Sequence, residues 1–331
     1  MAPPVGRARR AAAMTHYDVF NGDADGICAL HQLRLEQPLP SVLVTGVKRD
    51  IALLRRVPAQ AGDSVTALDI SAAENHAALA ALLARGVRVQ YFDHHFAGEL
   101  PVHPGLDATI DTDAGVCTGL IVDRHLGGRR QVWAIVAAFG DNLGAAARAL
   151  AAARGLAAAD IAALQGLGEA LAYNAYGDTE DDLIIHPAAL YRLLRPYDDP
   201  FRFVRAEAIV ARIGAVRRDD LDRARALAPD HASARASVYV LPDAAWSRRV
   251  RGAFGNELAN DHPDRAHAIL TPDAQGGYTV SVRAPLARRT GADALCRQFP
   301  TGGGRAAAAG INRLPREALR EFVRRLDQAF S

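Results

Sequence analysis

Residues 87–96 read VRVQYFDHHF, an apolar run that ends in one aspartate and two adjacent histidines. The apolar side chains of Val87–Phe92 predict a buried strand. Asp93, His94 and His95 follow at its carboxyl end, where ligand sites form in open α/β sheets. A single histidine would be read as a core residue, but an acid with two imidazoles favours metal or phosphate chemistry.

The chain before this stretch repeats the strand-then-helix pattern. Strands are predicted at His16–Phe20, Ser41–Gly46 and Ser64–Asp69, and helices from Ile27, near Ile51–Arg56 and over Ala72–Arg85. This alternation predicts βαβ units and a parallel sheet. Asp23 and Asp25 follow the first strand, and Asp69 ends the third. Each also has a structural alternative, because a turn or a helix N-cap at Asp25, and a helix cap at Asp69, would explain them.

Helical patterns dominate after about Thr112. They cover Gly115–His125, Gln131–Phe139, Leu143–Ala153, Ala157–Tyr173 and a long amphipathic stretch from Pro200 to Ala228. Asp141 ends one of these helices, where its charge opposes the helix dipole, and a bound cation would explain it. The C-terminal part mixes strands (Ser237–Leu241, Ala266–Leu270, Tyr278–Arg283) with helices (Trp246–Asn260, Gly291–Gln298, Pro315–Ala329).

Composition limits the classes of protein that fit. The 331 residues are 50% hydrophobic and 23% charged, which excludes a disordered or low-complexity chain. No apolar run is long enough to predict a membrane span. Cys28, Cys117 and Cys296 are far apart, which excludes a disulfide scaffold and fits a reducing cytoplasm, with Cys28 and Cys117 as core residues. Lys48 is the only lysine among 39 basic residues, a bias that we attribute to genome composition.

The charge is unevenly distributed. From Arg235 to Ser331 the chain has a net charge of +6, so the preceding residues have a net charge of −4. This pattern suggests an N-terminal part that binds cations and a C-terminal part that binds anions, although random scatter would also produce it.

The ordered motifs resemble those of the DHH phosphoesterase superfamily, which includes RecJ-type exonucleases and nanoRNA phosphodiesterases. The motifs are Asp23-x-Asp25-Gly26, Asp69, Asp93-His94-His95 and Gly140-Asp141. Residues 301–310 (TGGGRAAAAG) resemble the glycine motif of the companion DHHA1 domain, with Arg305 in place of its histidine. The resemblance implies an α/β protein. An N-terminal parallel-sheet DHH domain would span residues 14–199, a connector helix and linker 200–234, and a smaller α/β DHHA1-like domain 235–331. We expect residues 1–13 to be a disordered extension before a start at Met14.

The resemblance also implies a site for one or two Mn²⁺ ions, with Mg²⁺ as the alternative metal. The implied metal ligands are Asp23, Asp25, Asp69, His94 and Asp141. His95 would hydrogen-bond the phosphate or leaving oxygen, and Asp93 would orient an imidazole. Two positions that ligate a second metal in many members are Val19 and Asn21 here. Valine cannot ligate and an asparagine carbonyl is a weak ligand, so we expect the second ion to be loosely held, supplied with substrate, or absent.

The implied substrate-binding residues are Gly302, Gly303, Gly304, Arg305, Ser281 and Arg283. Gly302–Gly304 would turn sharply and present backbone N–H groups to an anion, and a helix from Ala306 would add a favourable potential. The alternatives are a simple Gly-rich turn and an edge-strand salt bridge at Arg283.

These features predict a cytoplasmic, metal-dependent phosphodiesterase without a membrane partner. Its substrate would be a short oligonucleotide or a linear or cyclic dinucleotide, because aromatic residues make up only 6% of the chain and limit base-stacking surfaces. A non-catalytic nucleotide-binding or nucleic-acid-binding protein, a polyphosphate or pyrophosphate hydrolase, and a homodimer remain open.

Overall fold

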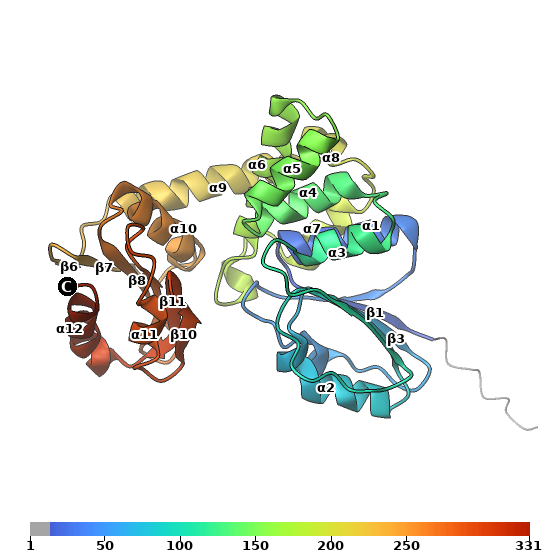
Figure 1. Ribbon diagram of the computed structural model, residues 1–331, viewed down its shortest axis with the longest axis horizontal. Helices are drawn as coiled ribbons and strands as arrows, with labels where there is room; N and C mark the ends of the chain where they lie inside the picture. The colour runs from blue at the N-terminus through green and yellow to red at the C-terminus, as the bar shows by residue number, and fades with distance from the viewer. Residues whose placement is uncertain (1–13) are drawn as a thin grey trace, which may run out of the picture. The chain divides into compact units, whose positions relative to one another are not determined.

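The computed structural model describes residues 14–331, which form two compact units (Figure 1). The first unit contains residues up to 172 together with His186–Glu207. The second contains Tyr173–Ile185 and Ala208–Ser331. The expected N-terminal extension, residues 1–13, lies outside the described residues.

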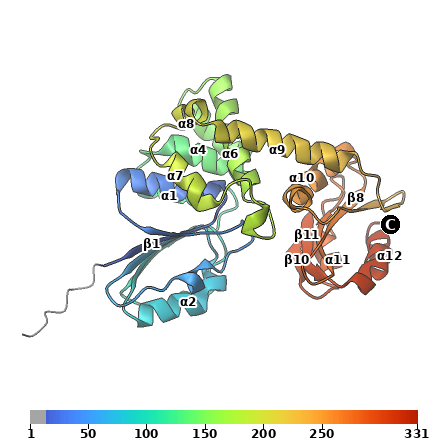
Figure 2. The ribbon, with the colours of Figure 1, turned by 180° about the vertical axis from the view of Figure 1, so that it is seen from behind.

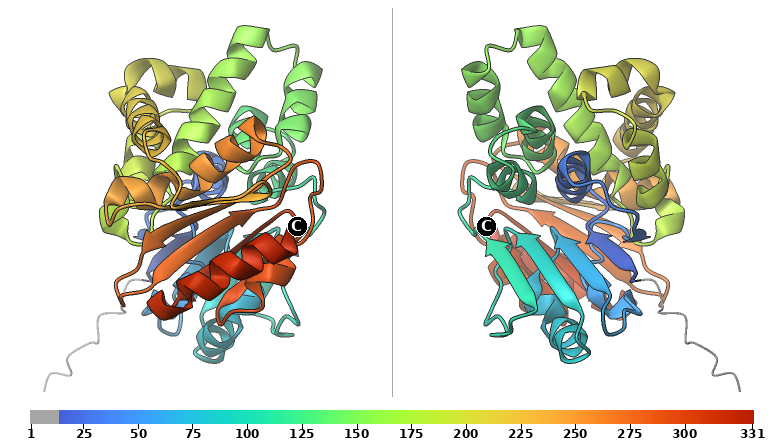
Figure 3. Two further views of the ribbon diagram at one scale, coloured as in Figure 1. Left: turned by 90° about the vertical axis from the view of Figure 1, so that its left-hand side faces the viewer. Right: turned by 90° about the vertical axis from the view of Figure 1, so that its right-hand side faces the viewer.

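The first unit is built on a five-stranded parallel sheet in the order β2-β1-β3-β4-β5. Its strands are β1 (His16–Phe20), β2 (Val42–Val44), β3 (Ser64–Leu68), β4 (Arg88–Asp93) and β5 (Leu106–Ile110). The right-hand view of Figure 3 shows its arrows pointing the same way. The predicted parallel sheet is confirmed, although β5 was missed because its side chains alternate between half-buried and exposed at the sheet edge. Because β1, β3 and β4 are adjacent, their carboxyl ends meet.

Helices cover both faces of this sheet. The 3₁₀ helix η1 (Leu53–Arg56) and α2 (Ala72–Ala84) pack on one face, where Leu53, Leu79 and their neighbours form a buried cluster. On the other face lie α1 (Ala24–Glu36), α3 (Thr118–His125), α4 (Gln131–Gly140) and α7 (Pro187–Leu194). Figure 2 shows α1 and α7 together on the side of β1 opposite α2. The helix α7 was not predicted.

The remaining helices are α5 (Gly144–Ala153), α6 (Ala158–Asn174), the 3₁₀ helix η2 (Glu180–Asp182), α8 (Pro200–Ala206) and α9 (Ala208–Arg225). Of these, α5 and α8 belong to the first unit, η2 and α9 to the second, and α6 crosses from the first into the second. The single helical stretch predicted from Pro200 to Ala228 is wrong, because Glu207 has an extended backbone that separates α8 from α9. Its carboxylate accepts a hydrogen bond from Tyr197 Oη at 2.7 Å, a contact that helical periodicity does not reveal.

The second unit contains a six-stranded mixed sheet in the order β10-β11-β9-β8-β7-β6. Its strands are β6 (His231–Ala232), β7 (Ala236–Val240), β8 (Ala266–Pro272), β9 (Tyr278–Arg283), β10 (Gly302–Arg305) and β11 (Ala308–Leu314). The helix α10 (Ala245–Asp261) packs on one face, and α11 (Ala292–Cys296) and α12 (Leu319–Ala329) on the other, with the 3₁₀ helix η3 (Arg316–Ala318) before α12. Figure 3 (left) shows α12 lying across this sheet.

The glycine motif has a different conformation from the one expected. Gly302–Arg305 is a strand that pairs with β11, so the helix expected from Ala306 is wrong. The strand β11 pairs with β10 on one side and with β9 on the other. The hydrogen bonds of this pairing outweigh the helical propensity of the alanines. Gly304 has φ 136°, and a Cβ there would lie 2.5 Å from Ala309 Cα, so glycine is required by the strand geometry itself.

In the part of the chain that the structure describes, no helix combines the length and apolar character needed to cross a bilayer.

Candidate metal centre

The first unit gathers one cluster of acidic and imidazole side chains where β1, β3 and β4 end. Six of the predicted site residues meet there: Asp23, Asp25, Asp69, His94, His95 and Asp141. They come from four separate segments of the chain. The parallel sheet brings the first three segments together, and the C-terminus of α4 supplies Asp141.

The two aspartates after β1 have different partners. Asp23, rather than Asp25, is the N-cap of α1, and its Oδ1 accepts from the N–H groups of Asp25 and Gly26 at 3.0 and 3.2 Å. Asp25 instead accepts from the N–H groups of Thr118 and Gly119, at 2.8 and 2.7 Å, at the start of α3. The N-cap interpretation of Asp25 is therefore wrong. Its carboxylate is instead held by the N-terminus of α3.

Gly119 permits this approach. A Cβ on Gly119 would lie 2.4 Å from the Cβ of Ala137 and 3.1 Å from Asp25 Oδ1. Any side chain would therefore push α3 away from both α4 and the carboxylate.

Asp69 has a strained backbone at the centre of the cluster. Its φ is 58°, a left-handed value that costs a non-glycine residue of the order of 1 kcal/mol or more. The N-cap of α2 is Ser71, so the helix-cap reading of Asp69 is also wrong. Its Oδ1 accepts a hydrogen bond from Thr118 Oγ1 at 3.2 Å and lies 3.4 Å from His94 Nε2.

His94 presents one nitrogen to three carboxylates. Its Nδ1 lies 3.0 Å from the carbonyl oxygen of Val116, which can only accept, so Nδ1 carries the proton. In the neutral imidazole Nε2 therefore carries the lone pair, and it lies 3.4, 3.8 and 4.0 Å from carboxylate oxygens of Asp69, Asp141 and Asp25. This tautomer is the one that a metal-ligating histidine requires.

His95 is paired with Asp93. Its Nδ1 lies 2.7 Å from Asp93 Oδ1, which leaves Nε2 available to other groups. Burial opposes protonation of His95, but the hydrogen bond and charge of Asp93 outweigh burial and raise the pKa of His95. Asp93 is fully buried, and its Oδ2 has no hydrogen-bond partner among residues 14–331.

Burial and mutual repulsion oppose the simultaneous ionisation of the carboxylates in this cluster. Burial, followed by the charges of Asp25 and Asp23, raises the pKa of Asp69 well above its usual range. Burial and Asp25 raise the pKa of Asp141 to about 6. A divalent cation would remove this conflict, and oxygen ligands with an imidazole suit Mn²⁺. The residues therefore fit a metal ion of this class.

Lys48 is the residue of this centre that sequence reasoning missed. Its Nζ lies 2.5 Å from Asp23 Oδ2 and 3.5 Å from Asp141 Oδ1. Burial opposes ionisation of Asp23, but the charge and hydrogen bond of Lys48 hold the pKa of Asp23 below its usual value. Two signals could have identified Lys48: it is the single lysine of the chain, and it closely follows the strand beside β1.

Asn21 positions this lysine and its partner. The Asn21 side chain accepts from Asp23 N–H at 3.2 Å through Oδ1 and donates to the Lys48 carbonyl at 3.1 Å through Nδ2.

Val19 is fully buried in the sheet core. Cys28 and Cys117 are buried, and burial raises the pKa of both thiols, so their assignment as core residues is confirmed.

The predicted substrate-binding residues lie on one sheet of the second unit. Ser281 and Gly303 both pair with Gly310, and Arg283 and Arg305 both pair with Ala308, so these side chains share one face. Gly302 and Gly304 belong to the same strand as Gly303 and Arg305, at the edge of the sheet.

Arg283 lies in an interior strand, so the edge-strand reading is wrong. It donates to Ser281 Oγ at 2.9 Å and to Asn256 Oδ1 at 2.5 Å. No carboxylate forms an ion pair with it among the described residues. Burial lowers its pKa, because its charge is partly removed from water. Its remaining bonds go to the carbonyls of Val282 and Gly252, so its charge is met by neutral acceptors alone.

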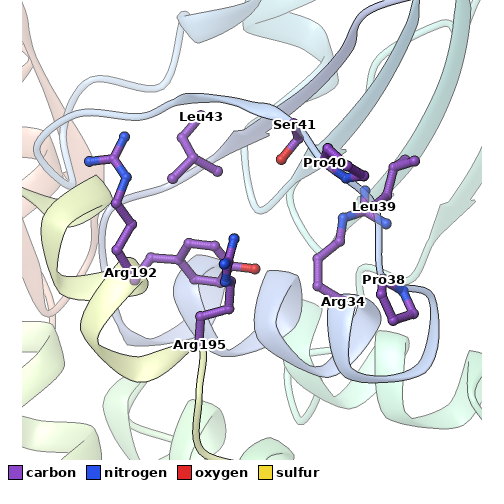
Figure 4. A pocket seen from close by; sticks show the side chains of 9 residues that line it. Arg34, Pro38, Leu39, Pro40, Ser41, Leu43, Arg192 and Arg195 are labelled. Carbon is purple, nitrogen blue, oxygen red and sulfur yellow. The ribbon is translucent and has the colours of Figure 1, made fainter.

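A separate basic cavity lies in the first unit, at the opposite end of α1 (Figure 4). It has a volume of about 800 Å³, and the described residues that line it include Arg34, Arg192 and Arg195 and no acid. Arg34 is held by Asp18, with Nε at 3.0 Å from Oδ2. None of the residues of the metal centre lines this cavity.

No protein-family model matches the chain, and no curated protein matches it. Several solved structures are similar to it in fold. An exonuclease RecJ bound to manganese is similar with a TM-score of 0.64 and 22% identity over 95% of this chain and 90% of that chain. A DHH-domain protein described as a member of a family of ribosomal proteins gives 0.61 and 14%, over 95% and 86%. RecJ from Thermus thermophilus, in complex with Mn²⁺, gives 0.55 and 20%, over 95% and 51%. The parallel sheet, the mixed second sheet and these likenesses show that the chain has the fold of the DHH phosphoesterase superfamily.

Proposed function

We propose that this protein is a metal-dependent phosphodiesterase that hydrolyses a small nucleotide substrate, such as a short oligonucleotide or a linear or cyclic dinucleotide. The observation that carries this proposal is the position of His94 Nε2, which lies within 4.0 Å of carboxylate oxygens from Asp25, Asp69 and Asp141. Four donors from distant segments converge on one point in a pattern that a structural ion pair does not need.

The metal would be held by Asp25, Asp69, His94 and Asp141. A bound Mn²⁺ would supply a nucleophile at neutral pH by lowering the pKa of water and would stabilise charge on a phosphoryl oxygen. The protein prepares the site by fixing each donor: Thr118 and Gly119 orient Asp25, and the Val116 carbonyl fixes the tautomer of His94.

His95 would act on the substrate. The raised pKa of His95 increases the fraction of the imidazole that is protonated near neutral pH. The hydrogen bond from Nδ1 to Asp93 fixes the orientation of the ring. Nε2 can therefore donate a hydrogen bond to a phosphoryl or leaving oxygen. Asp93 acts through His95 and is a positioning residue.

The second unit would bind phosphate groups of the substrate. Arg283 and Ser281 form a fixed donor pair, and Arg305 is exposed two strands away on the same face. The small residues Ala308 and Gly310 lie between them in the sheet. Two guanidinium groups on one face favour a substrate with more than one anionic group. The RecJ structures that hold manganese support the choice of metal.

A substrate panel tests the proposal. Mn²⁺-dependent release of p-nitrophenol from bis-p-nitrophenyl phosphate should be lost in Asp69→Ala, while thermal unfolding shows that the variant is folded. Dinucleotides, cyclic dinucleotides, nucleoside bisphosphates, polyphosphate and single-stranded DNA should then be compared. Preference for polyphosphate would replace the nucleotide assignment, and no turnover with any divalent metal would leave a binding protein.

A further inference from the structure

The metal centre contains one cation of its own. Lys48 Nζ lies between Asp23 Oδ2 and Asp141 Oδ1, at 2.5 and 3.5 Å. The Lys48 side chain is about one-third exposed, whereas that of Asp23 is almost completely buried, at 3%. A buried carboxylate needs a compensating charge, and this lysine supplies it.

The remaining donors suit a single ion. Two groups of three side chains in the described chain could hold a metal: Asp69, His94 and His95, or Asp25, His94 and Asp141. Both groups use His94, and neither uses Asp23. Because His94 Nδ1 bonds to the Val116 carbonyl, only Nε2 can ligate, and its single lone pair binds one ion. The two groups therefore share their one available lone pair on His94, and only one of them can hold an ion through it at a time.

The surroundings of Asp23 hold the lysine in place. Asn21 binds both the N–H of Asp23 and the carbonyl of Lys48, so its amide joins the two backbones that carry the ion pair. The Oδ1 of Asp23 is used by the first turn of α1, which leaves Oδ2 for Lys48. Asn21, whose side-chain oxygen could have ligated an ion beside Asp23, instead positions the ammonium group of Lys48.

The choice of residue is also informative. The chain uses arginine at 38 of its 39 basic positions and lysine only here. A lysine ammonium is a compact point charge that fits between two carboxylate oxygens, whereas the planar guanidinium of arginine is a larger, directional donor. An abundance of arginine can follow from genome composition, but the position of the single lysine then needs a chemical reason.

We infer that Lys48 takes the place of a second metal ion, so that this centre binds one divalent cation per chain and uses the ammonium group as its second positive charge. The inference rests on the proposed function, because it concerns the same metal centre. Lys48 would neutralise Asp23 and hold Asp141 toward the metal. It would also place a fixed positive charge beside the substrate phosphate.

Counting bound metal tests this assignment. Full-length protein is stripped with EDTA and dialysed to equilibrium against MnCl₂, and bound manganese is measured by elemental analysis. The wild type should hold one Mn²⁺ per chain. Lys48→Met should bind a second ion at least about tenfold more tightly than the wild type does, equivalent to ~1.4 kcal/mol. The control Lys48→Arg keeps the positive charge that should exclude a second ion, so it should remain at one even though its larger guanidinium fits the gap between the two carboxylates less well.

The single lysine allows a second measurement on the wild type, independent of any variant's folding. Labelling with [¹⁵N]lysine gives one side-chain ammonium resonance for the whole protein. One equivalent of Mg²⁺ should leave that resonance in slow exchange with water, because Lys48 stays paired with Asp23.

The outcomes separate the two proposals. A wild type that binds no Mn²⁺ would refute the metal-dependent function itself. Two tightly bound ions in the wild type would overturn the role of Lys48 while leaving the metal-dependent function intact. A Lys48→Met protein that still binds only one ion, or loss of the ammonium resonance on adding Mg²⁺, would likewise overturn it.

Discussion

Replacing Asp141 with asparagine should stabilise the metal-free protein at alkaline pH. Burial and the charge of Asp25 raise the pKa of this carboxyl from 3.8 to about 6. At ~1.4 kcal/mol per pH unit, ionising Asp141 costs the metal-free fold about 3 kcal/mol. The Asp141 side chain is 20% exposed, and its ionisation is coupled to that of Asp69, so both effects reduce this cost. We therefore expect Asp141→Asn to raise the free energy of unfolding by about 1–3 kcal/mol at pH 8.

The direction of the pH dependence follows from the raised pKa. A carboxyl whose pKa is higher in the folded state contributes stability that is fully present below 3.8 and is lost as the pH rises through about 6. The advantage of Asp141→Asn over the wild type should therefore be largest above pH 7 and shrink toward pH 4.

Urea unfolding in EDTA measures this difference. The chain has one tryptophan in each unit, Trp133 and Trp246, so a Trp246→Phe background makes fluorescence report on the buried Trp133 of the first unit. Saturating Mn²⁺ should reverse the order, because an ion at 100 times its Kd adds about 2.7 kcal/mol to a protein that binds it. The wild type has the full ligand set and should gain more than the variant.

The control is Asp198→Asn, at a carboxylate that is 63% exposed and that, among residues 14–331, forms an ion pair with the similarly exposed Arg202. It should change stability by less than about 0.5 kcal/mol. If Asp141→Asn is as stable as the wild type or less stable at pH 8 in EDTA, ionising Asp141 does not cost the metal-free fold the free energy expected from burial and the charge of Asp25.

Three further changes test other parts of the site. Gly119→Ala places a Cβ 2.4 Å from that of Ala137, so we expect a loss of about 1–3 kcal/mol in urea unfolding, with weaker Mn²⁺ binding by equilibrium dialysis. Arg305→Ala should raise KM for a dinucleotide far more than for bis-p-nitrophenyl phosphate, and equal effects in steady-state kinetics would remove Arg305 from substrate binding. Asp93→Asn should lower the pKa of His95 and move the alkaline limit of the kcat profile to lower pH, whereas an unchanged limit would contradict the pairing.

The position of the metal donors was predictable because it depends on local pattern and a general rule. Apolar runs identified β1, β3 and β4, and the acids and histidines lie just beyond their ends. The carboxyl ends of parallel strands share one edge of the sheet, which predicts that Asp25, Asp69 and His94 lie along the same edge. That β1 is the neighbour of β3, with β2 at the sheet's edge, was decided by the fold.

Other features depended on contacts between distant segments. The alanines after Arg305 have helical propensity, but pairing of β11 with both β9 and β10 makes them a strand. The break at Glu207 likewise has no periodic signal. The helix α7, in contrast, has an amphipathic pattern, a proline in its first turn and a capping His186, so it could have been predicted from sequence.

Sequence by itself determined four strands of a parallel sheet, the order of the motifs along the chain and the kinds of donor atom that they carry, because these follow from patterns within short segments. Tertiary structure alone decided how the donors are used. The tautomer of His94 is set by a carbonyl 22 residues away, and the partner of Asp23 by a lysine 25 residues away. Such pairings depend on where a loop lies in space, and local sequence carries no record of that position.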